Sequence, residues 1–298
     1  MTLLVNTAAR INDINKLPIT TRCSAYTAVL VYCDIFKGNE ALHKNIHAKY
    51  LEQKIIAQAS YTKEKSKQVK TEKEEEKWTD MKNLHQARLN WEVLAKTTKD
   101  KKKKVKYAKN WLISSLYTLI PPRRNEYRSL WYFPISDDAE GLEYYKKEEK
   151  AHNSLNCNFI YRCPTSPPIY KMVLREYKTH STYGDFQMLI DEEHPLYQPL
   201  KTYTDIYPAD CKFSSVNFSN CSYMFPNAKG DFMNTASWGR LLNSVFKSTG
   251  KKISSTMLRH IYISDKFKGD TPLQVRKDLA KLMGHKPSTA QMVYEKKE

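Results

Sequence analysis

Apolar residues recur every three or four positions over most of the chain, the spacing of helices that bury one face. The expected helices cover about 20–37, 40–60, 78–98, 111–120, 235–249, 255–266, 271–283 and 287–294. Gly38 is the expected end of the first of these helices, and Gly284 of the last but one. Capping residues support the C-terminal boundaries: Asn234 or Thr235, Ser254 or Ser255, and Thr271 followed by Pro272 at the first helical position.

The middle of the chain has a different pattern, with short stretches rich in aromatic and β-branched residues. The expected strands are Arg128–Phe133, Asn156–Arg162, Ile169–Tyr177 and Gly184–Ile190. The loop from Lys178 to Tyr183 joins the last two as a compact hairpin. We therefore predict a mainly α protein with a small antiparallel β-sheet, in the α+β class.

A charged segment at about 61–77 separates two regions of helical periodicity. It contains one aliphatic residue, Val69, and cannot bury a face. We predict a small helical N-terminal domain over 1–75, which includes most of this linker, and a larger domain over 78–298. An exposed helical spacer is the alternative for the acidic half of the segment.

The chain is strongly basic. Its 298 residues include 49 Lys and Arg against 32 Asp and Glu, a formal net charge of +17. A globular protein this positive favours a polyanionic partner, nucleic acid first and an acidic membrane surface second. The densest basic run either contacts phosphates or is a solvated helix face, and we predict phosphate contact. Its lysines are Lys101, Lys102, Lys103, Lys104, Lys106 and Lys109.

Composition argues against several other classes of protein. None of the 8 glycines has the spacing of a dinucleotide or phosphate loop, so we expect no nucleotide cofactor. The 6 cysteines form no C-x-x-C motif, and reduced thiols without a metal are favoured over ligation by the Cys157/Cys163 and Cys211/Cys221 pairs. The longest apolar run is too short for a membrane span, and no signal peptide is evident, so we expect an intracellular protein.

Four segments carry side chains suited to phosphate chemistry. They are Arg123 with Glu126, Lys178 in the hairpin loop, Arg259 with His260, and His285 followed by Tyr294. Arginine forks stabilise charge that develops on phosphate oxygens, and a tyrosine hydroxyl becomes a nucleophile beside such charges. A lysine at a hairpin tip is placed to protonate a departing hydroxyl.

In order and spacing these segments resemble the tyrosine recombinase (phage-integrase) family over roughly 78–298. The family pattern is an arginine with an acidic residue three positions later, a hairpin lysine, an H-x-x-R-H segment, and L-G-H with a tyrosine nine residues on. The Pro-Pro-Arg-Arg sequence that contains Arg123 looks most like variants from large DNA viruses, virophages and related mobile elements. One position departs from the family pattern. Thr256 stands where the family usually has histidine, and a threonine hydroxyl cannot take up and release a proton at neutral pH as histidine does.

The resemblance implies a site-specific recombinase or integrase that cleaves and rejoins double-stranded DNA through a covalent 3′-phosphotyrosyl intermediate, with no metal or other cofactor. The catalytic residues it implies are Arg123, Lys178, Arg259, His285 and Tyr294. The supporting residues it implies are Glu126, Thr256 and His260. It also implies a DNA-clamping N-terminal domain, a homo-oligomer (a tetramer on DNA), and action in the nucleus or cytoplasm of a host.

Two alternatives remain open at this point. A type IB topoisomerase shares the catalytic fold and the chemistry but relaxes DNA without exchanging partners. A basic, mostly helical DNA-binding protein without activity would show the same charge and the same linker.

Overall fold

The computed structural model describes residues 6–35, 40–133, 157–163, 165–206, 222–267 and 271–296. The chain divides between Val69 and Lys70 into two compact units, which are described separately below. The predicted helix end at Gly38, the first residue of the predicted strand from Asn156, and the thiols of Cys211 and Cys221 lie outside the described residues.

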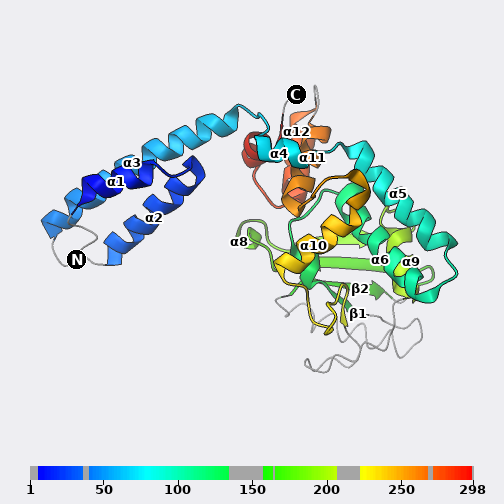
Figure 1. Ribbon diagram of the computed structural model, residues 1–298. Helices are drawn as coiled ribbons and strands as arrows, with labels where there is room; N and C mark the ends of the chain where they lie inside the picture. Colours follow the sequence, from blue (N-terminus) through cyan, green and yellow to red (C-terminus); the bar gives the residue numbers. More distant parts are fainter. Residues whose placement is uncertain are drawn as a thin grey trace. The chain divides into compact units, whose positions relative to one another are not determined.

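The first unit is a group of helices, shown in blue in Figure 1. They are α1 (Thr7–Asn15), α2 (Ile19–Ile35) and α3 (Glu40–Ser66). Tyr26, Leu30 and Tyr50 form the centre of its small core, where the two tyrosine rings lie 6.2 Å apart. α3 continues to Ser66, past its predicted end, because the Lys and Glu residues that follow favour an exposed helix.

The acidic part of the predicted linker forms a short helix, α4 (Glu72–Lys77), at the start of the second unit. A capping box begins it: the Thr71 hydroxyl accepts from the Glu74 amide, and the Glu74 carboxylate accepts from the Thr71 amide. The capping box thus stabilises the first turn of α4.

Helix α6 (Lys101–Thr118) is the central helix of the second unit, with α5 (Met81–Thr97) beside it. The lysine run and the apolar stretch, predicted as separate segments, form one helix capped by Asp100. All residues from 111 to 118 are buried, while the lysine-rich first half reaches solvent. The 1.5 Å rise per residue separates the two ends of α6 by about 25 Å.

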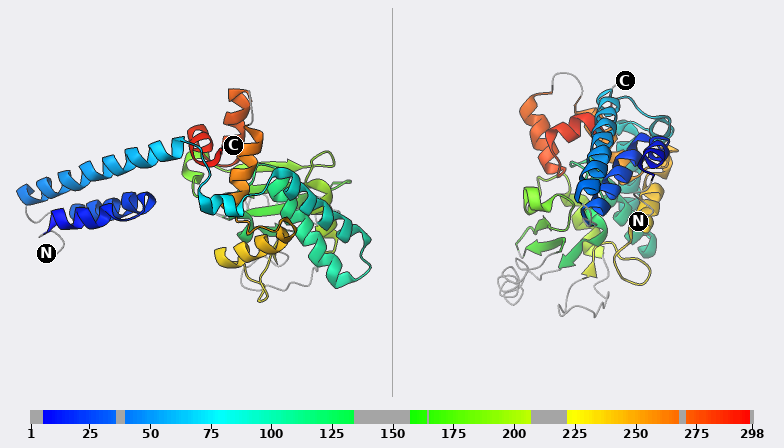
Figure 2. Two further views of the ribbon diagram at one scale, coloured as in Figure 1. Left: turned by 45° about the horizontal axis from the view of Figure 1, so that its top comes forward. Right: turned by 90° about the vertical axis from the view of Figure 1, so that its left-hand side faces the viewer.

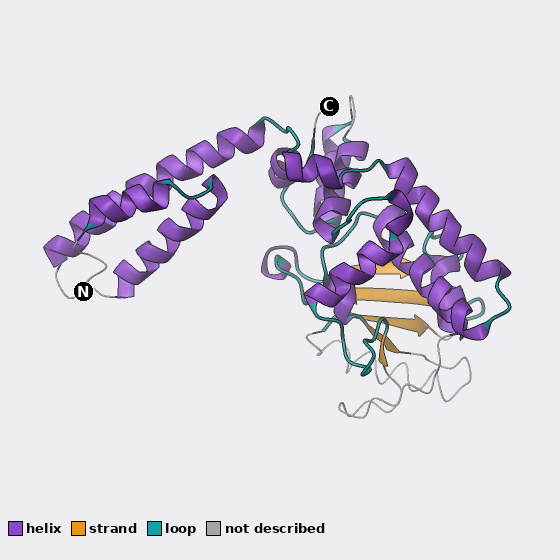
Figure 3. Cartoon of the chain, viewed as in Figure 1, coloured by secondary structure: helices purple, strands orange, loops and turns teal. Residues whose placement is uncertain are grey.

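A five-stranded sheet, in the order β4-β3-β2-β1-β5, packs beside α6 (Figures 1 and 3). The strands are β1 (Trp131–Phe133), β2 (Phe159–Cys163), β3 (Ile169–Leu174), β4 (Phe186–Ile190) and β5 (Ser222–Tyr223). Alternate residues of β3 face opposite sides: Met172 joins the main core, whereas Val173 joins a smaller cluster with Phe159. The face toward α6 is also covered by α9 (Tyr197–Ile206).

The sheet is mixed, so the prediction of a purely antiparallel sheet was wrong. β1 pairs in parallel with β2, and every other pairing is antiparallel. The long connection over 134–158 permits the parallel pairing, because parallel neighbours need a crossover of a dozen residues or more. The mainly helical α+β class holds, with strands limited to this one sheet among the described residues.

The C-terminal helices begin close to the predicted caps. They are α10 (Thr235–Val245), η2 (Lys247–Thr249), α11 (Ser255–Lys266), α12 (Leu273–Leu282), α13 (Pro287–Thr289) and the π-helical turn η3 (Ala290–Tyr294), the last of them orange to red in Figure 2. Asn234 and Ser254 are the N-caps of α10 and α11. At α12 the N-cap is Pro272 itself, one position later than predicted, because the Thr271 hydroxyl donates to the Lys266 carbonyl instead.

Candidate active site

Arg123 is buried where α6 gives way to the sheet. Pro121 and Pro122 follow the end of α6, and the 3₁₀ turn η1 (Glu126–Ser129) comes just after the arginine pair. Arg123 is 2% exposed, and its guanidinium carbon lies 5.0 Å from the centre of the Tyr177 ring and 4.1 Å from that of Phe186. The charge is thus held between two aromatic rings of the β3–β4 hairpin region.

Arg259 ties three separate segments together. It lies on α11, is 2% exposed, and donates to the carbonyl oxygens of Pro122 (2.9 Å) and Met283 (3.2 Å). Its Nη2 lies 2.8 Å from Nδ1 of His285. Because a guanidinium can only donate, Nδ1 must accept, and the ring proton of the neutral imidazole is on Nε2.

Tyr294 lies at the end of η3 against these cations. Its ring is 3% exposed and sits 4.8 Å from the guanidinium carbon of Arg259, with the His260 and His285 rings each 5.0 Å away. Its hydroxyl accepts a 2.8 Å hydrogen bond from Nη2 of Arg124. Arg124 was not among the predicted site residues, although the arginine pair was visible in the sequence.

The local charges set the protonation states of the site. Burial raises the pKa of the Tyr294 hydroxyl, but the Arg259 charge and the Arg124 hydrogen bond outweigh burial and bring it below its ordinary value of 10. Burial, with Arg259 beside the ring, lowers the pKa of His285 to about 3. Tyr294 is therefore easier to ionise than an ordinary tyrosine, and His285 is neutral at physiological pH.

Several buried donors of this cluster lack a hydrogen-bond acceptor among the described residues. They are Nε and Nη1 of Arg123, Nε of Arg259 and Nε2 of His285. Buried polar groups in folded proteins are nearly always paired, so a cluster of unpaired donors marks a place for a ligand with acceptors. A tetrahedral anion with several oxygens fits this set of forked and single donors.

Lys178 is exposed at the turn between β3 and the short helix α8 (His180–Tyr183). Its two neighbours are tied to the cluster. The Tyr177 ring lies under Arg123, and the Thr179 hydroxyl donates to the Gly284 carbonyl (2.6 Å). Asp185 braces the base of the turn by accepting from Arg175 (2.8 Å) and pairing with His180 (2.9 Å).

The supporting residues take different positions. The His260 ring is buried with Nδ1 3.2 Å from the Tyr294 carbonyl oxygen, which places it against the backbone of Tyr294. Glu126 is half-buried beside Tyr127. Thr256 is exposed on the first turn of α11, one turn before Arg259.

The predicted DNA-contacting lysines form the solvent-facing start of α6. Lys101, Lys102, Lys103 and Lys106 are exposed, and Lys104 and Lys109 are half-buried. Burial lowers the pKa of Lys109. Arg123 follows the far end of α6. Along the helix axis the lysines therefore lie between about 14 Å (Lys109) and about 25 Å (Lys101) from the end that leads to Arg123.

Gly284 is where the Lys178 turn and Arg123 meet the C-terminal segment. Its φ is +68°, and an added Cβ would lie 2.6 Å from Nη1 of Arg123 and 3.3 Å from the Thr179 hydroxyl. We expect Gly284→Ala to displace Arg123 and to slow any reaction at the site. Gly250→Ala is the matched control, because its φ is +71° and nothing lies within 4 Å. Both variants should lose roughly 1 kcal/mol from backbone strain in urea unfolding, and only Gly284→Ala should also impair the site. Equal behaviour of the two would contradict this.

The low pKa of His285 makes stability depend on acid. In the unfolded chain His285 takes up a proton as the pH falls below its ordinary pKa of 6.5. In the folded chain its pKa is about 3, so it stays neutral over most of this range. The contribution of neutral His285 to stability is therefore complete above pH 6.5. The free energy of unfolding falls as the pH is lowered from 6.5 towards 3. We expect His285→Gln to flatten the decline in urea titrations between pH 6.5 and 4. An unchanged slope would show that His285 protonates normally in the folded protein.

Comparisons with known proteins leave the activity open. No protein-family model and no curated protein matches the chain. A solved structure of XerA recombinase is similar with a TM-score of 0.40 and 15% identity, over 100% of this chain and 87% of that one. Among the described residues, no helix is long and apolar enough to cross a membrane, and no group of three or more metal-ligating side chains is found.

Proposed function

We propose that the chain is a DNA strand-cleaving and rejoining enzyme of the tyrosine recombinase type, with Tyr294 as its nucleophile. The observation that carries this proposal is the contact of the Tyr294 hydroxyl with Arg124 beneath Arg259. A tyrosine that merely fills a core has no need of two guanidinium groups at its hydroxyl and ring. The unpaired donors of Arg123, Arg259 and His285 add a nearby place for the phosphate.

The proposed reaction is a transesterification at phosphorus. The Tyr294 oxygen attacks the phosphorus atom of a phosphodiester and passes its proton to water, the new P–O bond forms, and the bond to the 5′ oxygen breaks. The guanidinium groups of Arg123, Arg124 and Arg259 stabilise the extra negative charge on the non-bridging oxygens. Neutral His285 donates through Nε2, and its low pKa makes it a hydrogen-bond donor and not a general acid.

Lys178 is proposed to supply the proton that the departing 5′ oxygen takes up. The lysine is exposed, and its turn is anchored to the cluster at Tyr177 and Thr179. The 3′-phosphotyrosyl ester retains the energy of the broken bond, so a 5′-hydroxyl of the same or of another strand can attack it in the reverse sense. No cofactor is needed for this exchange.

The substrate is proposed to be double-stranded DNA held mainly through its phosphates. The net charge of +17 and the exposed lysines of α6 support this choice. Strand exchange between two duplexes requires several copies of the chain, and we propose a tetramer on DNA. Integration or excision of a mobile element, as in the viral variants that the sequence resembles, is the proposed biological setting.

The test is to trap and locate the covalent bond. The protein is incubated with a pool of nicked duplexes of varied sequence, in which the loss of a short 5′-hydroxyl fragment prevents religation. Adducts are isolated in SDS and digested, and the nucleotide-bearing peptide is identified by mass. We expect the 3′-phosphate of the cleaved strand to be esterified to the hydroxyl oxygen of Tyr294. Failure to form any adduct, or attachment at another residue, would overturn it. Relaxation of plasmid without joining to a new partner would favour the topoisomerase reaction.

A further inference from the structure

Helix α4 lies at the start of the second unit's sequence and contacts the segment that carries Tyr294 at its end. One carboxylate oxygen of Glu74, Oε2, lies 3.2 Å from Nζ of Lys296, two residues after Tyr294. The other, Oε1, lies 3.7 Å from Nε2 of His260. Glu74 thus faces both a residue of the C-terminal segment and the ring that packs on Tyr294.

The position of this carboxylate is itself fixed. Oε2 accepts from the Thr71 amide (2.8 Å) and from the Thr71 hydroxyl (3.0 Å) in the capping box. Burial raises the pKa of Glu74, but the hydrogen bond from the Thr71 amide and the contact with Lys296 outweigh burial and keep it below its ordinary value. The group is therefore a negative charge held in place by its own helix.

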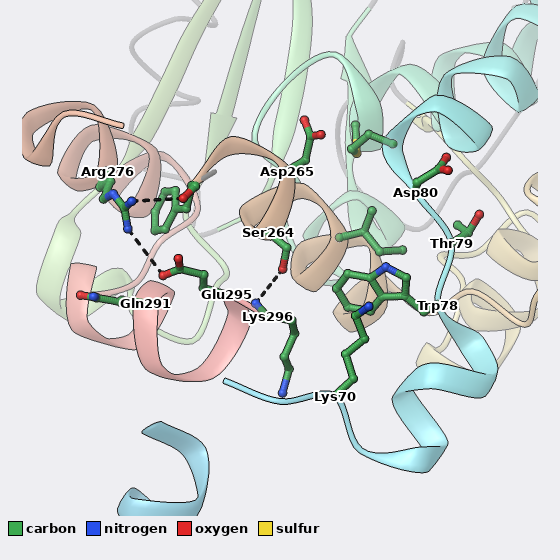
Figure 4. Close-up of a pocket in the computed structure, with 13 residues that line it drawn as sticks. Lys70, Trp78, Thr79, Asp80, Ser264, Asp265, Arg276, Gln291, Glu295 and Lys296 are labelled. Carbon is green, nitrogen blue, oxygen red and sulfur yellow. Dashed lines mark hydrogen bonds and ion pairs between the residues drawn. The ribbon is translucent and has the colours of Figure 1, made fainter. Parts of the chain in front are cut away.

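The residues directly after Tyr294 are buried and make several polar contacts. Glu295 and Lys296 line a cavity of about 610 Å³ together with Trp78 and Ser264 (Figure 4). Among the lining residues, the Lys296 amide donates to the Ser264 hydroxyl (2.8 Å), and Arg276 lies 3.5 Å from the Glu295 carboxylate. The ion pair with Glu74 adds to these contacts a tie from an element that lies far away in the sequence.

We propose that Glu74 is a positioning residue, and that α4 is a strap which holds the Tyr294 segment against its own catalytic cluster through Lys296 and His260. The second part of the claim rests on the proposed function, since it takes Tyr294 as the nucleophile. Glu74 touches neither the hydroxyl of Tyr294 nor its arginines. It acts through the backbone and the ring that fix where the hydroxyl lies.

The experiment compares Glu74→Gln with Glu76→Gln, which removes the same charge from an exposed position of the same helix. Glutamine keeps an oxygen for the Thr71 amide, so α4 remains capped. Amide hydrogen exchange measured by mass spectrometry should become faster for the peptide spanning 287–298 in Glu74→Gln only. Lys296→Gln breaks the same pair from the other side and should have the same effect.

The catalytic readout is the rate of adduct formation at saturating DNA. A displaced nucleophile costs up to about a hundredfold, so we expect Glu74→Gln to slow adduct formation roughly tenfold or more. DNA affinity should be unchanged, and the double variant with Lys296→Gln should be no slower than the slower single one. The Glu76→Gln variant should behave as the parent protein.

The possible failures are separable. Unchanged exchange in both Glu74→Gln and Lys296→Gln overturns the strap, whatever the activity. Faster exchange with an unaltered adduct rate overturns the positioning role of Glu74. If the parent protein forms no adduct on any DNA, the proposed function fails, and the exchange measurement alone then decides whether α4 restrains the segment.

Discussion

Replacing Tyr294 by phenylalanine is expected to abolish covalent attachment to DNA while leaving DNA affinity and the fold in place. The variant keeps the ring that packs between His260 and His285 and beneath Arg259, and removes only the hydroxyl. A phenyl ring has no atom able to form a phosphate ester, so the loss should be complete. Adducts resistant to SDS measure the first effect, and a salt-controlled binding titration measures the second.

Tyr262→Phe is the matched control for this substitution. Tyr262 is also buried and lies on α11, but burial and the nearby Asp265 charge raise its pKa to about 12. Its hydroxyl is thus harder to ionise than that of Tyr294, and its removal should leave adduct formation unchanged. An adduct formed by Tyr294→Phe at the parental rate would exclude Tyr294 as the nucleophile.

The boundaries of the C-terminal helices could be predicted because their signals are local. Asn234 and Ser254 each accept from a backbone amide three residues later, as the capping pattern implies. Helix α9 was not predicted, since it contains Pro199 and proline usually interrupts a helix. Here the proline lies in the first turn, where the missing amide proton costs no intrahelical hydrogen bond. The parallel pairing of β1 with β2 depends on contacts between distant segments, which no local pattern encodes.

In the candidate site, too, local spacing could select some residues, while others are placed by contacts between distant segments. Spacing alone selected Arg123, because an acidic residue follows it three positions later, and gave no reason to select its neighbour. Consecutive side chains take different directions at this turn: Arg123 lies between Tyr177 and Phe186, whereas Arg124 reaches the Tyr294 hydroxyl. The contribution of Glu74 was hidden for a similar reason, since it comes from a segment whose composition resembles a linker.

Arg259→Lys is expected to slow adduct formation by about a hundredfold to a thousandfold, the range seen when one preorganised donor is lost. Lysine keeps the positive charge but replaces a planar fork by a single ammonium. The guanidinium of Arg259 contacts Pro122, Met283 and His285. One ammonium cannot keep all three contacts and also donate to the proposed phosphate. Single-turnover rates at saturating DNA, with urea unfolding to verify the fold, measure the effect.

Arg128→Lys provides the comparison for loss of a half-buried guanidinium outside the cluster. Arg128 donates to the Met233 carbonyl (3.0 Å) and lies 5.3 Å from the centre of the Phe232 ring, so its replacement removes a similar contact. We expect a modest loss of stability, about 1 kcal/mol, and the parental rate of adduct formation. A large loss of rate in this variant would mean that the assay responds to general destabilisation.

The pH dependence of Arg259→Lys separates its charge from its geometry. In the parent protein the rate should rise with pH through a value below 10, because Arg259 and Arg124 lower the pKa of the Tyr294 hydroxyl. An ammonium close to the ring still favours the ionised tyrosine, so the inflection should stay below 10 while the plateau falls. A retained plateau with a raised inflection would instead mean that Arg259 acts only through its charge on Tyr294. Loss of the plateau alone would locate its main effect at the proposed phosphate, where the planar fork presents donors in a fixed side-by-side geometry that an ammonium cannot reproduce.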